Sequence, residues 1–157
     1  MIFATVGTQL PFPRLMDALD AIAARHGIEI FAQTGYGGYV AKHMETAASL
    51  DPATFSEKVA AARLIVGHAG MGTILTARKA QKPAILMPRI AAKGEHRNEH
   101  QRATAAQMQG VPGYYIAEDA AALEALILRG DLVPAGEQES PARQQLIARL
   151  REFIAAG

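Results

Sequence analysis

Two short apolar segments, joined by a glycine-rich turn and a helix, constrain this chain more than any other feature. The segments are residues 64–66 and 84–87, and neither shows the polar alternation of a strand with one exposed face. Strands without alternation are buried on both faces, as in a parallel sheet that helices cover. Ligands bind outside the carboxyl ends of such strands, so the polar residues that follow these segments are the first candidates for a functional site.

The rest of the chain alternates between short strand patterns and helical patterns. The further strands are predicted at residues 2–6, 28–33, 44–47 and 114–116. The helices are predicted at residues 13–26, 52–62, 74–80, 98–109, 120–128 and about 138–156. This alternation predicts an α/β fold, with a Rossmann-like, doubly wound parallel sheet. We expect a single domain over residues 1–157, ending in the helical segment at about 138–156.

Composition excludes several classes of function. The net charge is +1, which gives no electrostatic reason to expect nucleic acid or a strongly anionic surface as partner. The chain has no cysteine, so thiolate chemistry and disulfides are excluded. Residues 1–6 enter a strand pattern directly and do not resemble a signal peptide. Because no apolar run approaches the roughly 20 residues of a membrane span, we expect a cytoplasmic protein.

The glycine-rich turn has the sequence Gly70-Met71-Gly72-Thr73 and leads into a helix. It lacks the Gly-Lys-Ser/Thr of a Walker A loop, and its spacing differs from the G-x-G-x-x-G dinucleotide fingerprint. A helix N-terminus attracts anions, so the turn can hold a phosphate, or it can be only a tight strand-to-helix turn. Gly7 and Thr8 form a similar loop after another strand, which favours a ligand between the two loops.

The polar segment after the second apolar segment allows three interpretations. His96, Glu99 and His100 match the H-x-x-E-H pattern of zinc hydrolases. The same residues can form a solvated helix start, or the segment can contact a ligand through Glu95 or Gln101. Nearby Arg89 follows a proline at a strand end, where it can face a phosphate or lie on the surface.

Together these motifs resemble the C-terminal domain of family 28 glycosyltransferases. The resemblance covers roughly residues 1–115 and is carried by Gly7-Thr8, by the loop from His68 to Thr73, by Pro88-Arg89 and by the segment from Gly94 to Gln101. Among its members the chain is most similar to the single-domain Alg13-like and PssE-like subunits. The family implies a GT-B arrangement, in which this domain holds the nucleotide-sugar donor and a second domain holds the acceptor.

The resemblance also implies roles for individual residues. The turn at Gly70–Thr73 would hold the diphosphate, and Gln101 would hydrogen-bond sugar hydroxyls. Thr76 stands where larger relatives have a ribose-binding glutamate, so Glu95 would take over that contact. The full set of implied donor-binding residues is Gly7, Thr8, His68, Gly70, Met71, Gly72, Thr73, Arg89, Glu95, His100 and Gln101.

The implied reaction is inverting transfer from a UDP-sugar, a substrate rather than a cofactor, without a metal. The expected acceptor is a lipid-linked saccharide in exopolysaccharide or glycolipid synthesis, and the sugar is glucuronate, with Arg89 or Arg97 near its carboxylate, or N-acetylglucosamine. His68 and His96 are possible bases, but we expect the base on a membrane-associated, Alg14-like or PssD-like acceptor subunit that recruits the chain to the inner membrane face. The first alternative is a non-catalytic assembly subunit, and the second is a metal-dependent hydrolase that uses His96, Glu99 and His100.

Overall fold

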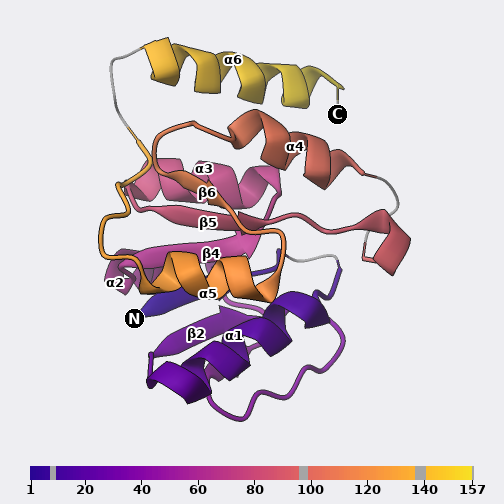
Figure 1. The fold of residues 1–157 in the computed structure, drawn as a ribbon, viewed down its shortest axis with the longest axis vertical. Helices are drawn as coiled ribbons and strands as arrows, with labels where there is room; N and C mark the ends of the chain where they lie inside the picture. Colours follow the sequence, from indigo (N-terminus) through magenta and orange to yellow (C-terminus); the bar gives the residue numbers. More distant parts are fainter. Residues whose placement is uncertain (8–9, 96–98, 137–140, 157) are drawn as a thin grey trace.

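The computed structural model of the chain describes residues 1–7, 10–95, 99–136 and 141–156. Six parallel strands form one sheet in the order β3-β2-β1-β4-β5-β6 (Figure 1). Their bounds are Ile2–Thr5 for β1, Ile30–Gln33 for β2, Glu45–Ala47 for β3, Leu64–His68 for β4, Ala84–Met87 for β5 and Tyr114–Ile116 for β6. This order, 3-2-1-4-5-6, is that of the doubly wound fold. Strands β2 and β3 lie on one side of β1, and the chain then returns to place β4 on the other side of β1.

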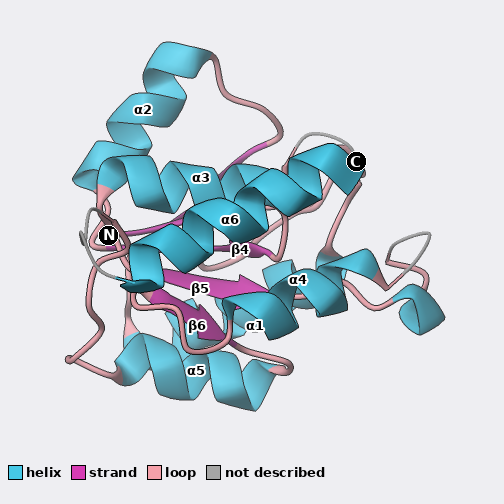
Figure 2. Cartoon of the chain, turned by 90° about the horizontal axis from the view of Figure 1, so that it is seen from above, coloured by secondary structure: helices cyan, strands magenta, loops and turns pink. Residues whose placement is uncertain are grey.

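Helices cover both faces of the sheet (Figures 1 and 2). Their bounds are Pro13–His26 for α1, Pro52–Ala61 for α2, Met71–Ala80 for α3, His100–Met108 for α4, Ala120–Leu128 for α5 and Pro141–Ala156 for α6, with a 3-10 turn, η1, at Ala91–Lys93. One core cluster joins α1 and α5 to one face of the sheet, and a second joins α2, α3, α4 and α6 to the other. Alternation along β1 places Ile2 in the first cluster and Phe3 in the second.

Local signals explain where several helices begin and end. Asp51 caps α2 by accepting a hydrogen bond from the Thr54 amide, and Pro52 takes the first helical position, as the sequence predicted. Asp119 caps α5 in the same way. Gly27 ends α1 in the left-handed region, at φ 62°.

Some predicted boundaries differ from the structure. The second strand begins at Ile30 rather than residue 28, and β4 extends to His68 because Met87 of β5 pairs with it. The fourth helix begins at His100, while Asn98 and residues 138–140 of the predicted last helix lie outside the described residues. The η1 turn was not predicted. None of the helices in the described ranges is long and apolar enough to cross a lipid bilayer.

Candidate functional site

A cavity of about 400 Å³ opens at the carboxyl ends of β1, β2 and β4, next to the first turn of α3. Its described lining residues are Thr5, Gly7, Gln33, Leu50, Pro52, Phe55, His68, Gly72, Thr73 and Thr76. The cavity therefore lies at the point where strand order reverses, which is the usual ligand position in this type of sheet. Of the predicted site residues, the structure brings Gly7, His68, Gly72 and Thr73 together here.

The N-terminus of α3 faces this cavity with polar groups that the protein does not fully use. Gly70 is its N-cap and has no side chain to accept the first-turn N–H groups. The Thr73 side chain is 2 % exposed, and its Oγ1 has no hydrogen-bond partner among the described residues. A Cβ at Gly72 would meet no atom within 4 Å. The turn thus combines uncapped amides, an unpartnered hydroxyl and open space, which suits an oxyanion.

The His68 imidazole occupies the space that side chains at Gly7 and Gly70 would need. A Cβ on Gly7 would lie 3.1 Å from His68 Nε2, and a Cβ on Gly70 would lie 2.3 Å from His68 Cε1. Gly7 also has a φ of 76°, which L side chains rarely adopt. The sequence interpretation, in which Gly70 lets a ligand approach the backbone, is therefore incomplete, because the histidine ring fills that space.

Two polar residues at the base of the cavity were not singled out from the sequence. Thr5 Oγ1 donates to Gln33 Oε1 over 2.9 Å and accepts from the Gly7 amide over 3.2 Å. Both side chains are 4 % exposed. The available signal was a threonine and a glutamine at the ends of strands that are otherwise apolar. Their contacts fix the Gly7 turn beside the cavity.

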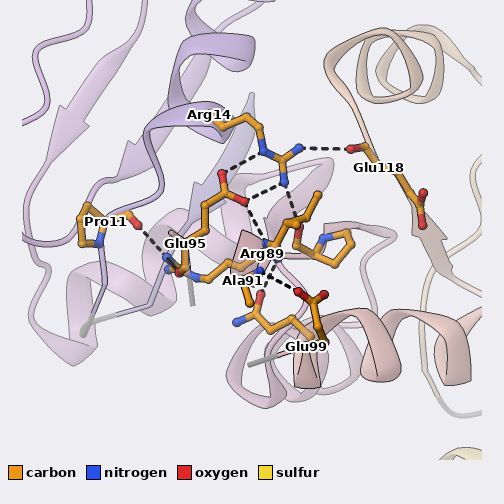
Figure 3. A network of polar contacts seen from close by, with 10 residues as sticks. Pro11, Arg14, Arg89, Ala91, Glu95, Glu99 and Glu118 are labelled. Carbon is orange, nitrogen blue, oxygen red and sulfur yellow. Dashed lines mark hydrogen bonds and ion pairs between the residues drawn. The ribbon is translucent and has the colours of Figure 1, made fainter. Parts of the chain in front are cut away.

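Arg89 is buried and binds the protein's own backbone. The residue is 2 % exposed. Its guanidinium donates to the carbonyls of Val6, Leu10 and Pro11 over 2.8, 2.8 and 2.6 Å, and the contact with Pro11 is drawn in Figure 3. The guanidinium also lies over the Phe12 ring. Burial lowers the pKa of Arg89, and the charge of Glu95 opposes that effect. The burial of Arg89 rules out the alternative of a surface arginine, while its expected phosphate contact stays a prediction, with Nη1 and Nη2 directed at the loop after β1. Arg97, the other candidate for a carboxylate contact, lies outside the described residues.

Glu95 joins the loop after β5 to α1. Its two carboxylate oxygens accept from Arg14 Nε and Nη2 over 2.9 and 3.0 Å, and one of them also accepts from the Ile90 amide over 2.9 Å (Figure 3). Arg14 donates further to the carbonyls of Pro88 and Glu118. The Glu95 side chain is 9 % exposed. The predicted ribose contact of Glu95 stays a prediction; in this structure its carboxylate is partly buried and accepts three hydrogen bonds from Arg14 and Ile90.

We expect Glu95→Gln to make stability less dependent on pH in acid. Burial raises the pKa of Glu95, but the hydrogen bonds from Arg14 and Ile90 and the Arg14 charge outweigh it, so the net pKa lies below the ordinary 4.5. A lowered pKa means that the ionised group stabilises the fold above the unfolded-state value and loses this effect as pH falls through the folded value. In urea unfolding, Glu95→Gln should be about 1–2 kcal/mol less stable than the wild type at neutral pH, and this difference should disappear as pH falls through the folded-state pKa of Glu95, which lies below 4.5.

Glu57 is exposed, and Glu57→Gln is the matched control for this charge change. It should change the free energy of unfolding measurably neither at neutral pH nor in acid. A constant difference between Glu95→Gln and the wild type across the acid range would show that the Glu95 carboxylate is not stabilised in the folded state.

The residues at the start of α4 divide between surface and interior. His100 is exposed, and Glu99 accepts from the Ala91 amide over 3.0 Å. Gln101 is 7 % exposed; its Oε1 accepts from the Arg89 amide over 3.0 Å, and its Nε2 lies 2.9 Å from His68 Nδ1. Gln101 thus contacts a site histidine, whereas the sequence interpretation gave it only the sugar.

The remaining predicted residues are not tested. Thr8 and His96 lie outside the described residues. Within the described ranges no group of three or more His, Cys, Asp or Glu side chains is placed to hold a metal ion, and the H-x-x-E-H hypothesis stays a prediction because it needs His96. Met71 is the first residue of α3, directly after the Gly70 cap.

A six-stranded parallel sheet in this order, with a cavity and an uncapped helix at its switch point, defines a Rossmann-like α/β domain. The family model of the glycosyltransferase family 28 C-terminal domain matches residues 1–153. The chain therefore belongs to that family. No curated protein sequence matches it significantly.

Solved structures with the same fold include glycosyltransferases and a sugar-nucleotide epimerase. An NMR structure of ALG13 shares 17 % identity at a TM-score of 0.64, with 92 % of this chain and 93 % of that one covered. The calicheamicin glycosyltransferase CalG4 shares 18 % at 0.62, with 99 % and 39 % covered. A Methanocaldococcus jannaschii UDP-GlcNAc 2-epimerase, solved with UDP-GlcNAc and UDP, shares 11 % at 0.58, with 97 % and 45 % covered. The chain thus spans less than half of the last two proteins, and all three likenesses establish the fold alone.

Proposed function

We propose that this chain is the donor-binding subunit of a two-component, inverting UDP-sugar glycosyltransferase. The observation that carries the proposal is the buried, unpartnered Thr73 hydroxyl at the uncapped N-terminus of α3, on the wall of the 400 Å³ cavity. Membership of the family supports the same conclusion. In this proposal the diphosphate is neutralised by the α3 amides, the helix dipole and the Thr73 hydroxyl, and the protein holds no cofactor.

The lining of the cavity includes both polar and apolar groups. Gly72, Thr73 and His68 supply polar contacts for the diphosphate, while Leu50 and Phe55 form an apolar wall that suits the flat face of the uracil ring. Thr76 also lines the cavity. Since the Glu95 carboxylate is held by Arg14 and Ile90, we propose that the Thr76 hydroxyl takes the ribose contact instead.

The reaction is proposed to join an acceptor hydroxyl to the anomeric carbon of the sugar. The acceptor oxygen forms the new bond, the bond from that carbon to the diphosphate breaks, and UDP leaves with the electron pair. A base must remove the acceptor proton. None of the described residues that line the cavity is a carboxylate. In this proposal the base lies on a second, membrane-associated subunit that presents a lipid-linked saccharide of exopolysaccharide or glycolipid synthesis, and this chain is recruited from the cytoplasm.

The test is calorimetric titration of the chain, alone and with its partner subunit, with UDP, UDP-glucuronate and UDP-N-acetylglucosamine. Thr73→Ala should weaken UDP binding about tenfold or more, because it removes a hydrogen bond to a charged group. Thr73→Ser keeps the hydroxyl and should bind within about threefold of the wild type. Thermal unfolding of both variants separates a loss of binding from a loss of folding.

Other outcomes identify the alternatives. No nucleotide binding with or without the partner would contradict the proposal. Transferase activity that survives both Thr73→Ala and Gln101→Ala would favour a non-catalytic assembly subunit. Stoichiometric zinc that is lost in His100→Ala would favour the hydrolase instead.

A further inference from the structure

We infer that Gln101 holds His68 as a neutral imidazole with its proton on Nε2, which makes His68 a hydrogen-bond donor and not the base of the reaction. The tautomer follows from contacts inside this chain. Only its consequence for catalysis rests on the proposed function.

The first step is the orientation of the Gln101 amide. The backbone N–H of Arg89 can only donate, and it lies 3.0 Å from Gln101 Oε1. An amide turned the other way would place two donors against each other. The Arg89 main chain is itself held, because its guanidinium is bound to three carbonyls of residues 6–11. The oxygen of the Gln101 side chain is therefore fixed toward Arg89.

The second step is the contact between Gln101 and His68. With Oε1 facing Arg89, the Gln101 NH₂ group lies 2.9 Å from His68 Nδ1. An amide NH₂ only donates, so Nδ1 must accept and cannot carry a proton. A neutral imidazole then bears its proton on Nε2, and an imidazolium is disfavoured because it would present a donor at Nδ1.

The third step is the position of the two side chains. The His68 ring occupies the spaces next to Gly7 and Gly70, where added Cβ atoms would lie 3.1 and 2.3 Å from its atoms. Gln101 is 7 % exposed, so water reaches the amide poorly. The contact with the buried Gln101 amide therefore favours an unprotonated Nδ1.

This arrangement separates two roles that a histidine beside a donor site can have. A protonated Nε2 donates a hydrogen bond, whereas a base needs an unprotonated nitrogen. The lone pair of Nδ1 is occupied by Gln101. Gln101 is thus a positioning residue that acts through His68, and the proton of the acceptor must leave to a group other than His68.

The test is an NMR measurement on the full chain without any nucleotide. Long-range ¹H–¹⁵N spectra report which nitrogen of each imidazole is protonated, and His68→Asn assigns the His68 signals. At a pH well above the ordinary histidine pKa of about 6.5, the wild type should show a protonated Nε2 and an unprotonated Nδ1.

Because free imidazole already favours the Nε2-protonated form, the decisive comparison is Gln101→Glu. A carboxylate can only accept, so the proton of His68 should move to Nδ1 in that variant. Gln109→Glu places the same charge at the exposed end of α4 and should leave the His68 signals unchanged. A purely structural role of Gln101 would not move the proton between the two nitrogens.

A second measurement does not depend on the variant folding. In wild-type chain labelled with ¹⁵N at glutamine and histidine, a scalar coupling should connect the Gln101 side-chain nitrogen with His68 Nδ1. A protonated Nδ1 in the wild type, a Gln101→Glu spectrum with Nε2 still protonated, or the absence of this coupling would overturn the inference. UDP takes no part in these measurements, so they can fail or succeed independently of the proposed donor site.

Discussion

Replacing Arg89 by alanine should lower the free energy of unfolding by about 3–5 kcal/mol. The guanidinium is 2 % exposed and is the hydrogen-bond partner of the carbonyls of Val6, Leu10 and Pro11. Alanine would leave these carbonyls in a buried void with no donor. Each unsatisfied buried acceptor costs about 1–3 kcal/mol. Water that partly enters the void keeps the total loss of stability below the sum of the costs of the three carbonyls. The Arg89 side chain thus holds the end of β5 against the loop after β1 through these hydrogen bonds.

Urea unfolding measures this effect, with two comparisons that separate its causes. Arg102→Ala removes an exposed arginine whose ion pair with Glu99 spans 3.7 Å, and it should change stability by less than about 0.5 kcal/mol. Arg89→Lys keeps the charge but loses the planar fork of donors, so it should fall between the wild type and Arg89→Ala. A loss below about 1 kcal/mol in Arg89→Ala would mean that the loop after β1 rearranges freely around an empty site.

Arg89 also shows what the sequence could not provide. Three of its four carbonyl partners lie 83, 79 and 78 residues away along the chain, so no local pattern indicates whether its side chain points inward. The ion pair of Glu95 with Arg14 spans 81 residues and was equally hidden. Both residues follow a strand that was predicted correctly, and both were assigned to a ligand because polar residues at strand ends commonly bind one.

The elements themselves were predictable where local physics decides them. The apolar runs of β4 and β5 had no polar alternation, and the structure buries both strands. Asp51 and Pro52 placed the start of α2 to the residue, since the cap and the first helical position are both local signals. The η1 turn after β5 was missed because the Glu95 contact with the Ile90 amide, which helps to fix that loop, depends on Arg14 far away in the sequence.

The sequence predicted a glycine-rich turn before α3, but it did not predict what each glycine lies against. The sequence shows Gly67, Gly70 and Gly72 only as closely spaced glycines around one strand-to-helix turn. In the structure, Gly70 makes room for the His68 ring, and Gly67 lies where strand and helix meet most closely. Gly72 has open space beside it, in the cavity. The three positions should therefore respond differently to the same substitution.

Gly67→Ala and Gly72→Ala are a matched pair that tests this difference. A Cβ at Gly67 would lie 2.7 Å from Thr73 Cγ2 and 2.9 Å from the Thr5 carbonyl oxygen, a backbone atom of β1. The first turn of α3 would have to move away from the sheet, at a cost of about 2–3 kcal/mol. Alanine at Gly72 meets no atom and should leave stability unchanged or raise it by up to about 1 kcal/mol, because glycine is a poor helix former.

In Gly72→Ala, the effect on UDP binding should be separate from the effect on stability. The methyl group of Gly72→Ala would project into the space proposed for the diphosphate, so UDP affinity should fall about tenfold in a chain as stable as the wild type. Denaturant unfolding and calorimetry, each applied to both variants, give the two measurements. If Gly72→Ala bound UDP normally, the diphosphate could not lie against the first turn of α3. If Gly67→Ala were as stable as the wild type, α3 would not be held against β4 as closely as the contact with Thr73 requires, and the fixed Thr73 hydroxyl would no longer support an anion site there.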